Sequence, residues 1–211
     1  MKTTKLLQIR TLATVALAAS LSLTSLSRAA SVVGSKHDLK ALTNAGGQVC
    51  IACHTPHNAQ ATQLVPLWNH TASTTTFTLY SSPTSKASFS QPAGATKACL
   101  SCHDGTVAID SFGGKAPAGG GTVTAGSNLG TSLADDHPVS FTYDAALATA
   151  TANGKLISPS SASWVDSAKT VPLFAGKLEC ASCHDAHDNS LGNFLRKSNN
   201  GSALCLTCHN Q

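Results

Sequence analysis

The sequence predicts a fold of mostly irregular coil, with a few short α-helices at its cysteine pairs and little or no sheet. Apolar residues show only weak helical periodicity, and few stretches alternate as strands do. Clusters of turn-forming residues are frequent, for example SSPTS, FGGKAPAGGG and ISPSSAS. Phe, Trp and Tyr together make up 5% of the 211 residues, so something other than large side chains has to fill the interior.

The first residues have the pattern of a secretory signal peptide. A basic head with Lys2, Lys5 and Arg10 precedes an apolar stretch and small residues. We expect residues 1–29 to be removed, with cleavage near Ala29 or Ala30. The alternative is an uncleaved membrane anchor, although the stretch is short and interrupted by Ser and Thr. No other segment is apolar enough to cross a bilayer, so we expect no transmembrane segment in the mature chain.

Residues 30–211 are predicted to form a single domain with two pseudo-repeated halves, about 30–140 and 141–211. Each half begins its cysteine pattern with C-x-x-C-H-x-x-H, at 50–57 and 180–187, and continues with a plain C-x-x-C-H, at 99–103 and 205–209. The intervals between the pairs are long for loops of an ordinary compact domain. The chain is therefore either largely disordered or wrapped around something.

Removal of the leader changes the charge of the protein. The chain has 14 Lys and Arg against 10 Asp and Glu, and four of the basic residues, Lys2, Lys5, Arg10 and Arg28, belong to the leader. Subtracting these four leaves ten basic residues against ten acidic ones, so the mature polypeptide is formally neutral. This balance gives no basic surface for nucleic acid, and we expect no nucleic-acid partner.

C-x-x-C-H is the attachment signature of c-type haem. Two thiols add to the porphyrin vinyl groups, and the adjacent histidine becomes the proximal iron ligand. The sequence therefore predicts four haem c groups per chain. The predicted attachment residues are Cys50, Cys53, Cys99, Cys102, Cys180, Cys183, Cys205 and Cys208, and the predicted proximal ligands are His54, His103, His184 and His209.

Three other interpretations explain the cysteines less well. Disulfides are common in exported proteins, but they give no reason for a histidine to follow every second cysteine. Zinc sites combine pairs with more variable histidine spacing. A thioredoxin-like pair would occur once, near a βαβ pattern that this sequence lacks.

The second axial ligands are expected to be histidines, because Met1 is the only methionine and leaves with the leader. His57 and His187 each lie three residues after a proximal ligand, about 4.5 Å along a helix, so neither can reach round its own haem and both should bind a neighbouring one. His137 precedes a proline, which holds it out of helix. Of His37 and His70, one is in excess, and we expect it to be His70.

The resemblance to a known group is carried by motifs that span nearly the whole mature chain. They are His37-Asp38-Leu39, CHTPHN from Cys53, PLWN from Pro66, CLSCHDGTVA from Cys99, HPVSF from His137, CASCHDAHDN from Cys180, FLR from Phe194 and CLTCH from Cys205. The chain resembles the multihaem c-type cytochromes of anaerobically respiring bacteria. It is most similar to the four-haem extracellular cytochromes of metal-reducing bacteria, whose subunits polymerise into filaments (nanowires).

The resemblance implies a coil-rich fold with haems in place of a hydrophobic core, two histidines at every iron, and electron transport. It implies a homopolymer in which one subunit lends an axial histidine to its neighbour, and by position His37 would take that role. His70 departs from the pattern, since arginine is common there in such proteins. The distal ligands then predicted are His37, His57, His137 and His187.

Four six-coordinate irons leave no open position for a substrate, so we expect an electron carrier and not an enzyme. Other cytochromes would be its electron donor and acceptor, and its location would be extracellular or at the cell surface. The alternatives are a soluble periplasmic shuttle and a multihaem oxidoreductase with one open haem.

Overall fold

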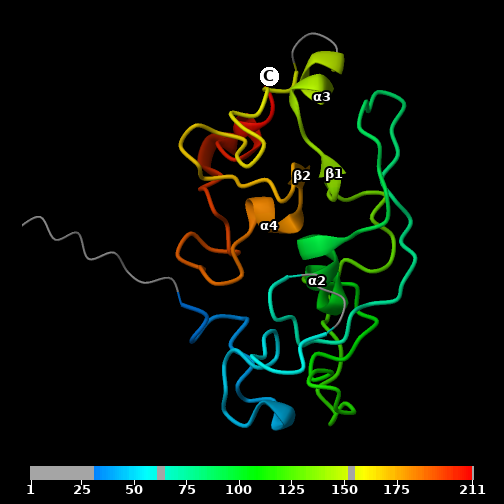
Figure 1. Cartoon of the computed structure of the whole chain (residues 1–211), viewed down its shortest axis with the longest axis vertical. Coiled ribbons are helices and arrows are strands. Elements are labelled where there is room, and N and C mark those ends of the chain that lie inside the picture. Colours follow the sequence, from blue (N-terminus) through cyan, green and yellow to red (C-terminus); the bar gives the residue numbers. More distant parts are fainter. Residues whose placement is uncertain (1–30, 61–64, 152–154, 211) are drawn as a thin grey trace, which may run out of the picture.

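The computed structural model describes residues 31–60, 65–151 and 155–210. The predicted signal peptide lies outside these residues. Within them the chain is mostly coil with short helices and one two-stranded sheet (Figure 1), which confirms the predicted fold class. None of the helices in this described part of the chain is both long and apolar enough to span a membrane.

The regular elements are few and short. The helices are η1 (Thr43–Ala45), α2 (Gly94–His103), α3 (Ala145–Ala150), α4 (Cys180–Cys183), η3 (Asn200–Ser202) and η4 (Cys205–Thr207). Strands β1 (Phe141–Thr142) and β2 (Lys177–Leu178) pair antiparallel, with Phe141 opposite Leu178. Of these helices, α2, α4 and η4 contain cysteines of the motifs, as the sequence predicts, whereas η1, α3 and η3 lie outside the motifs and no helix in the described part of the chain covers Cys50 and Cys53.

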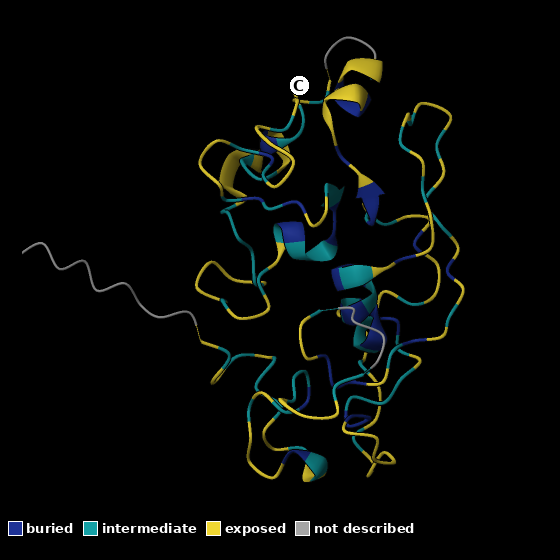
Figure 2. Ribbon diagram, in the orientation of Figure 1, coloured by how far each residue is buried: buried dark blue, intermediate teal, exposed yellow. Residues whose placement is uncertain are grey.

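Apolar packing is divided among small clusters. One cluster, with Phe141, Tyr143 and Leu173 among its members, surrounds the sheet. A second contains Phe112 and a third contains Phe77 and Leu100. Figure 2 shows buried segments around α2, α4 and β1, with exposed residues along most of the loops. Side chains alone therefore give the described part of the chain only a weak core.

Glu179, just before α4, connects α4 to α2 and to the loop before β1. Its side chain is buried and accepts hydrogen bonds from the Thr96 amide (3.2 Å) and the Ser140 hydroxyl (3.3 Å). Thr96 of α2 also binds α4 directly, because its hydroxyl accepts a hydrogen bond from the Cys180 amide (3.1 Å). Ser182 completes a capping box at the start of α4. These bonds hold the second and third cysteine motifs side by side.

Replacing Glu179 with Ala should destabilise the protein, because the buried Thr96 amide would lose its acceptor. We expect the free energy of unfolding to fall by about 1–3 kcal/mol, measured by denaturant titration of the haem-loaded chain. Asp135 is an exposed acid and serves as the matched control. Asp135→Ala should change the stability by less than about 0.5 kcal/mol, and an equal effect of both variants would contradict the connecting role of Glu179.

Candidate functional site

Each C-x-x-C-H motif forms one helical turn that places two thiols and a histidine together. The second motif forms the end of α2. In the other three, the histidine amide donates to the carbonyl of the first cysteine, over 2.8 Å for His54, 3.0 Å for His184 and 2.9 Å for His209. The shared turn explains why the spacing of the three reactive groups does not vary along the chain.

Backbone carbonyls orient three of the four motif histidines. The Nδ1 atoms of His54, His103 and His184 lie 2.9, 2.7 and 2.8 Å from carbonyl oxygens of Pro66, Ser127 and Asn193. An Nδ1–H that donates to a carbonyl leaves Nε2 with its lone pair free for a metal. These three acceptors cannot be predicted from the sequence, because any residue supplies a backbone carbonyl.

The first and third motifs are each followed by a loop, here called the return loop, in which the chain folds back onto the motif histidine. This loop brings the acceptor carbonyl to the histidine ring. His54 bridges to Trp68 and His184 bridges to Leu195 in the same antiparallel manner. In each loop a non-glycine residue with positive φ follows the acceptor carbonyl, namely Leu67 (57°) and Phe194 (56°). Such conformations cost of order 1–3 kcal/mol and are concentrated at functional sites. The segments PLWN and FLR, which lie in these two loops, are the part of the sequence from which the loops could have been recognised.

The cysteines form no disulfides in the structure, and burial raises the pKa of several thiols, whereas hydrogen bonds with Cys99 and Thr96 lower the pKa of Cys180. All eight are free. Burial raises the pKa of the Cys53 and Cys183 thiols to about 11 and that of Cys102 to about 12. A thioredoxin-like or zinc-binding cysteine needs a low thiol pKa, and the described residues contain no cluster of metal-binding groups of the zinc type.

Neighbouring motifs are linked through their cysteines in the order of the sequence. The thiols of Cys99 and Cys180 share a hydrogen bond, which together with burial raises the pKa of Cys99. Cys53 adds to the rise in the pKa of Cys102, and Cys208 does the same for Cys183, which places these pairs close together. The four motifs therefore form a row.

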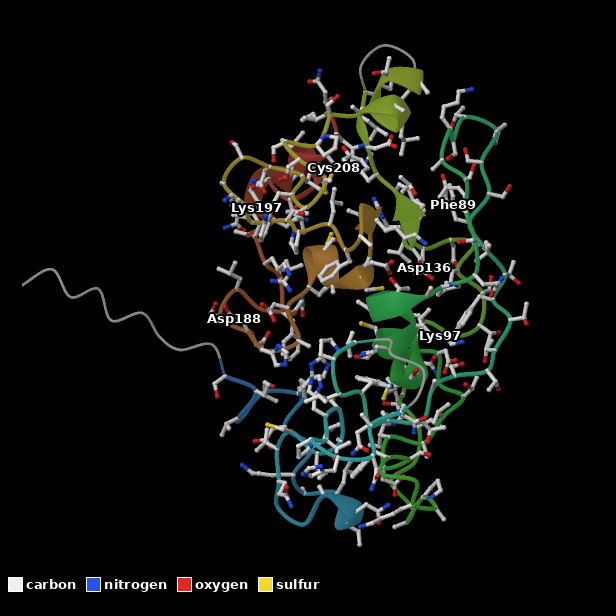
Figure 3. All side chains as sticks on the ribbon, in the orientation of Figure 1. Phe89, Lys97, Asp136, Asp188, Lys197 and Cys208 are labelled. Atoms are coloured by element: carbon white, nitrogen blue, oxygen red, sulfur yellow. The ribbon has the colours of Figure 1, made fainter. Side chains whose placement is uncertain are left out.

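The row follows the length of the molecule. The first motif lies in the blue to cyan segment below α2, and α2 and α4 lie at the centre (Figure 1). Figure 3 shows Cys208, in the fourth motif, above α4, whereas Lys97 on α2 lies below it. Any group carried by each motif is thus brought next to the group carried by the following one.

Three histidine pairs have the spacing of two ligands on one iron. The ring centroids are 6.2 Å apart for His37 and His103, 6.1 Å for His54 and His187, and 6.3 Å for His137 and His209. With metal–nitrogen bonds of about 2.0 Å and a nitrogen about 1.1 Å from its ring centroid, imidazoles on opposite sides of one iron have centroids about 6 Å apart. The donor set therefore fits three such irons within one chain.

His57, His184 and His70 do not belong to these three histidine pairs. His57 and His184 are exposed, and neither ring packs against another ring in the described part of the chain. His70 is buried, and both of its ring nitrogens face carbonyl oxygens, of Thr71 (2.9 Å) and Ala108 (3.1 Å). His37 lies with its ring centroid 6.2 Å from that of His103 in its own chain. Its donation to a neighbouring subunit stays a prediction.

An apolar cavity of about 210 Å³ opens beside the third motif. It is lined by Cys180, Cys183 and His184 together with apolar side chains such as Phe89 and Leu129. The polar residues Asp136, His137 and Glu179 also line it. Cysteines, a histidine and an apolar wall are the surroundings that a covalently bound porphyrin needs. The residues present therefore fit haem at this motif.

The comparisons with known proteins agree with this chemistry. A family model described as a doubled CXXCH motif matches residues 172–211, which contain the third and fourth motifs. A search of curated proteins finds no match. The doubled motif indicates covalently bound c-type haem and electron transfer, and it is consistent with a multihaem c-type cytochrome.

The number of haems can be tested by intact mass spectrometry of the exported protein. We expect four haems per chain and no free thiol, because all eight cysteines lie in attachment motifs. A Cys99→Ala and Cys102→Ala double variant should lose the mass of one haem. Fewer than four haems in the wild-type protein, or a thiol that reacts with iodoacetamide, would contradict the assignment.

Proposed function

We propose that this protein transfers electrons through four covalently bound, bis-histidine c-type haems, as the subunit of an extracellular polymer used in anaerobic respiration. The observation that carries the proposal is the row of motifs, in which Cys53 lies near Cys102, Cys99 contacts Cys180 and Cys183 lies near Cys208. Haems attached to such cysteines would be close enough to pass electrons from one to the next.

The polymer is supported by His57 and His184, whose rings pack against no other ring among the residues that the structure describes. His184 belongs to an attachment motif and needs a second ligand, whereas His57 is exposed and follows the first motif. In the repeat, His57 corresponds to His187 and His184 corresponds to His54, and His54 and His187 pair within the chain. His57 of one subunit would therefore complete the haem held by His184 of the next. The donated histidine is then His57 and not His37.

Charge and apolar surface favour this contact. The mature polypeptide carries ten basic and ten acidic residues, so subunits do not repel one another through net polypeptide charge. Leu67 and Leu191 are each about half exposed and lie in the return loops of the first and third motifs. Covering these loops would remove apolar surface from water at the same place as the metal bond.

His57→Ala should leave four haems attached but prevent polymerisation, with one haem per chain becoming high-spin. Mass spectrometry, electron paramagnetic resonance (EPR) and electron microscopy of the secreted protein measure these three outcomes. His187→Ala is the matched control, because it removes the same residue from the other copy of the motif. It should also give one high-spin haem, but its filaments should remain, since His187 pairs inside the chain.

His37→Ala separates the two possible donors. Because His37 lies against His103 of its own chain, this variant should keep its filaments while one haem becomes high-spin. Loss of filaments in His37→Ala but not in His57→Ala would assign the donated ligand to His37. Wild-type protein that stays monomeric at high concentration would instead favour a soluble periplasmic shuttle.

A multihaem reductase is the second candidate, and the exposed His184 without a ring partner is the observation that favours it. An iron with one protein ligand can bind a substrate such as a nitrogen or sulfur oxide. A high-spin EPR signal in the fully assembled wild-type protein would support this function. A fully low-spin spectrum would leave electron transfer as the activity.

A further inference from the structure

His70 is the one histidine that the haem sites do not use, and it is held rigidly beside the second motif. The side chain is 1% exposed, and its backbone bridges to Phe112. Its Nδ1 lies 2.9 Å from the Thr71 carbonyl oxygen. Its Nε2 lies 3.1 Å from the Ala108 carbonyl oxygen and 3.5 Å from the sulfur of Cys102.

Haem attachment changes what Nε2 can bind. A free Cys102 thiol can donate its S–H to Nε2, which suits a neutral imidazole. When that thiol adds to a vinyl group, its hydrogen goes to carbon and the sulfur becomes a thioether, which cannot donate. Nε2 then faces only acceptors, and Nδ1 faces the Thr71 carbonyl. Each nitrogen needs its own hydrogen, which only the imidazolium cation provides.

A buried anion lies near this histidine. Asp110 is 1% exposed, and its Oδ2 accepts hydrogen bonds from the amides of Ala118 (2.6 Å) and Gly120 (2.9 Å). Its Oδ1 is buried without a hydrogen-bond partner in the described part of the chain. The charge of His70 helps those amides to lower the pKa of Asp110 against the effect of burial. A buried carboxylate of this kind needs a cation nearby.

The other groups around His70 do not supply that cation. Trp68 packs at a tilt, with the ring centroids 6.2 Å apart, and α2 presents Cys102. Burial holds the pKa of His70 below its ordinary value, although the carbonyl acceptors and Asp110 act in the opposite direction. Removal of the S–H donor shifts this balance toward the charged form.

We propose that His70 is an imidazolium cation in the haem-loaded protein and that it raises the reduction potential of the haem on Cys99 and Cys102. The inference rests on the proposed function, because it requires haem at the second motif. A positive charge favours the reduced haem, which carries one positive charge fewer than the oxidised one. His70 contacts the attachment sulfur directly, so its charge acts on this haem more than on the others.

The protonation state can be measured on the wild-type protein with all haems reduced. Solid-state NMR of protein labelled with ¹⁵N-histidine is suitable for filaments and for monomers. We expect one histidine with hydrogens on both ring nitrogens, and its signal should be absent in His70→Gln. A neutral ring at His70 in protein that carries all its haems would overturn the inference.

The effect on the haem can be measured by a redox titration in which NMR of the haem methyl groups assigns each step. His70→Gln should lower the reduction equilibrium constant of the second haem about tenfold, or 59 mV for one electron, as expected for a unit charge about 10 Å away at an effective dielectric constant of about 20. His70→Arg keeps the charge and should restore most of the difference.

Equal shifts in both variants, or no shift in either, would show that His70 is only a packing residue and would overturn the inference. Loss of the second haem from wild-type protein, seen by mass, would instead contradict the proposed function. The two failures are therefore distinguishable in the same set of samples.

Discussion

The contact between α2 and α4 determines where the other parts of the haem-binding region lie. Glu179, the N-cap residue of α4, makes this contact by accepting hydrogen bonds from Thr96 and Ser140. The thiols of Cys99 and Cys180 meet at the same place. Because the second and third motifs are thus fixed at the centre, the first and fourth motifs can extend the row in opposite directions along the chain.

The chain has few other means of holding its shape. Helices and strands are short, and the apolar clusters are small and separate. In the proposed ligation, an iron between two histidines would tie distant segments together, as for His54 with His187 and His37 with His103. A covalently bound haem also removes conformations from the unfolded chain, as any cross-link does. The cofactor would therefore act as structure as well as electron carrier, and long coil segments become tolerable.

The two copies of C-x-x-C-H-x-x-H have the same local structure, but their second histidines differ in whether they have a partner within the chain. Both hold the motif histidine with a return-loop carbonyl, and both place a second histidine on the surface side of the turn. His187 finds its partner within the chain, whereas His57 does not find one among the described residues. In the proposed polymer, the second histidine of one copy would bind inside the subunit and that of the other copy would bind outside it, so the repeat would serve assembly.

The sequence by itself determined the coil-rich fold and the c-type haem chemistry, because the thiol and imidazole groups of the motif must stand at a fixed local spacing. It could not determine the pairing of His37 with His103 or of His137 with His209, since these contacts join segments that only the folded chain brings together. Nor could it identify Glu179, the carbonyls of Pro66, Ser127 and Asn193, or the surroundings of His70. Burial and backbone direction decide those interactions, and both are properties of the tertiary structure.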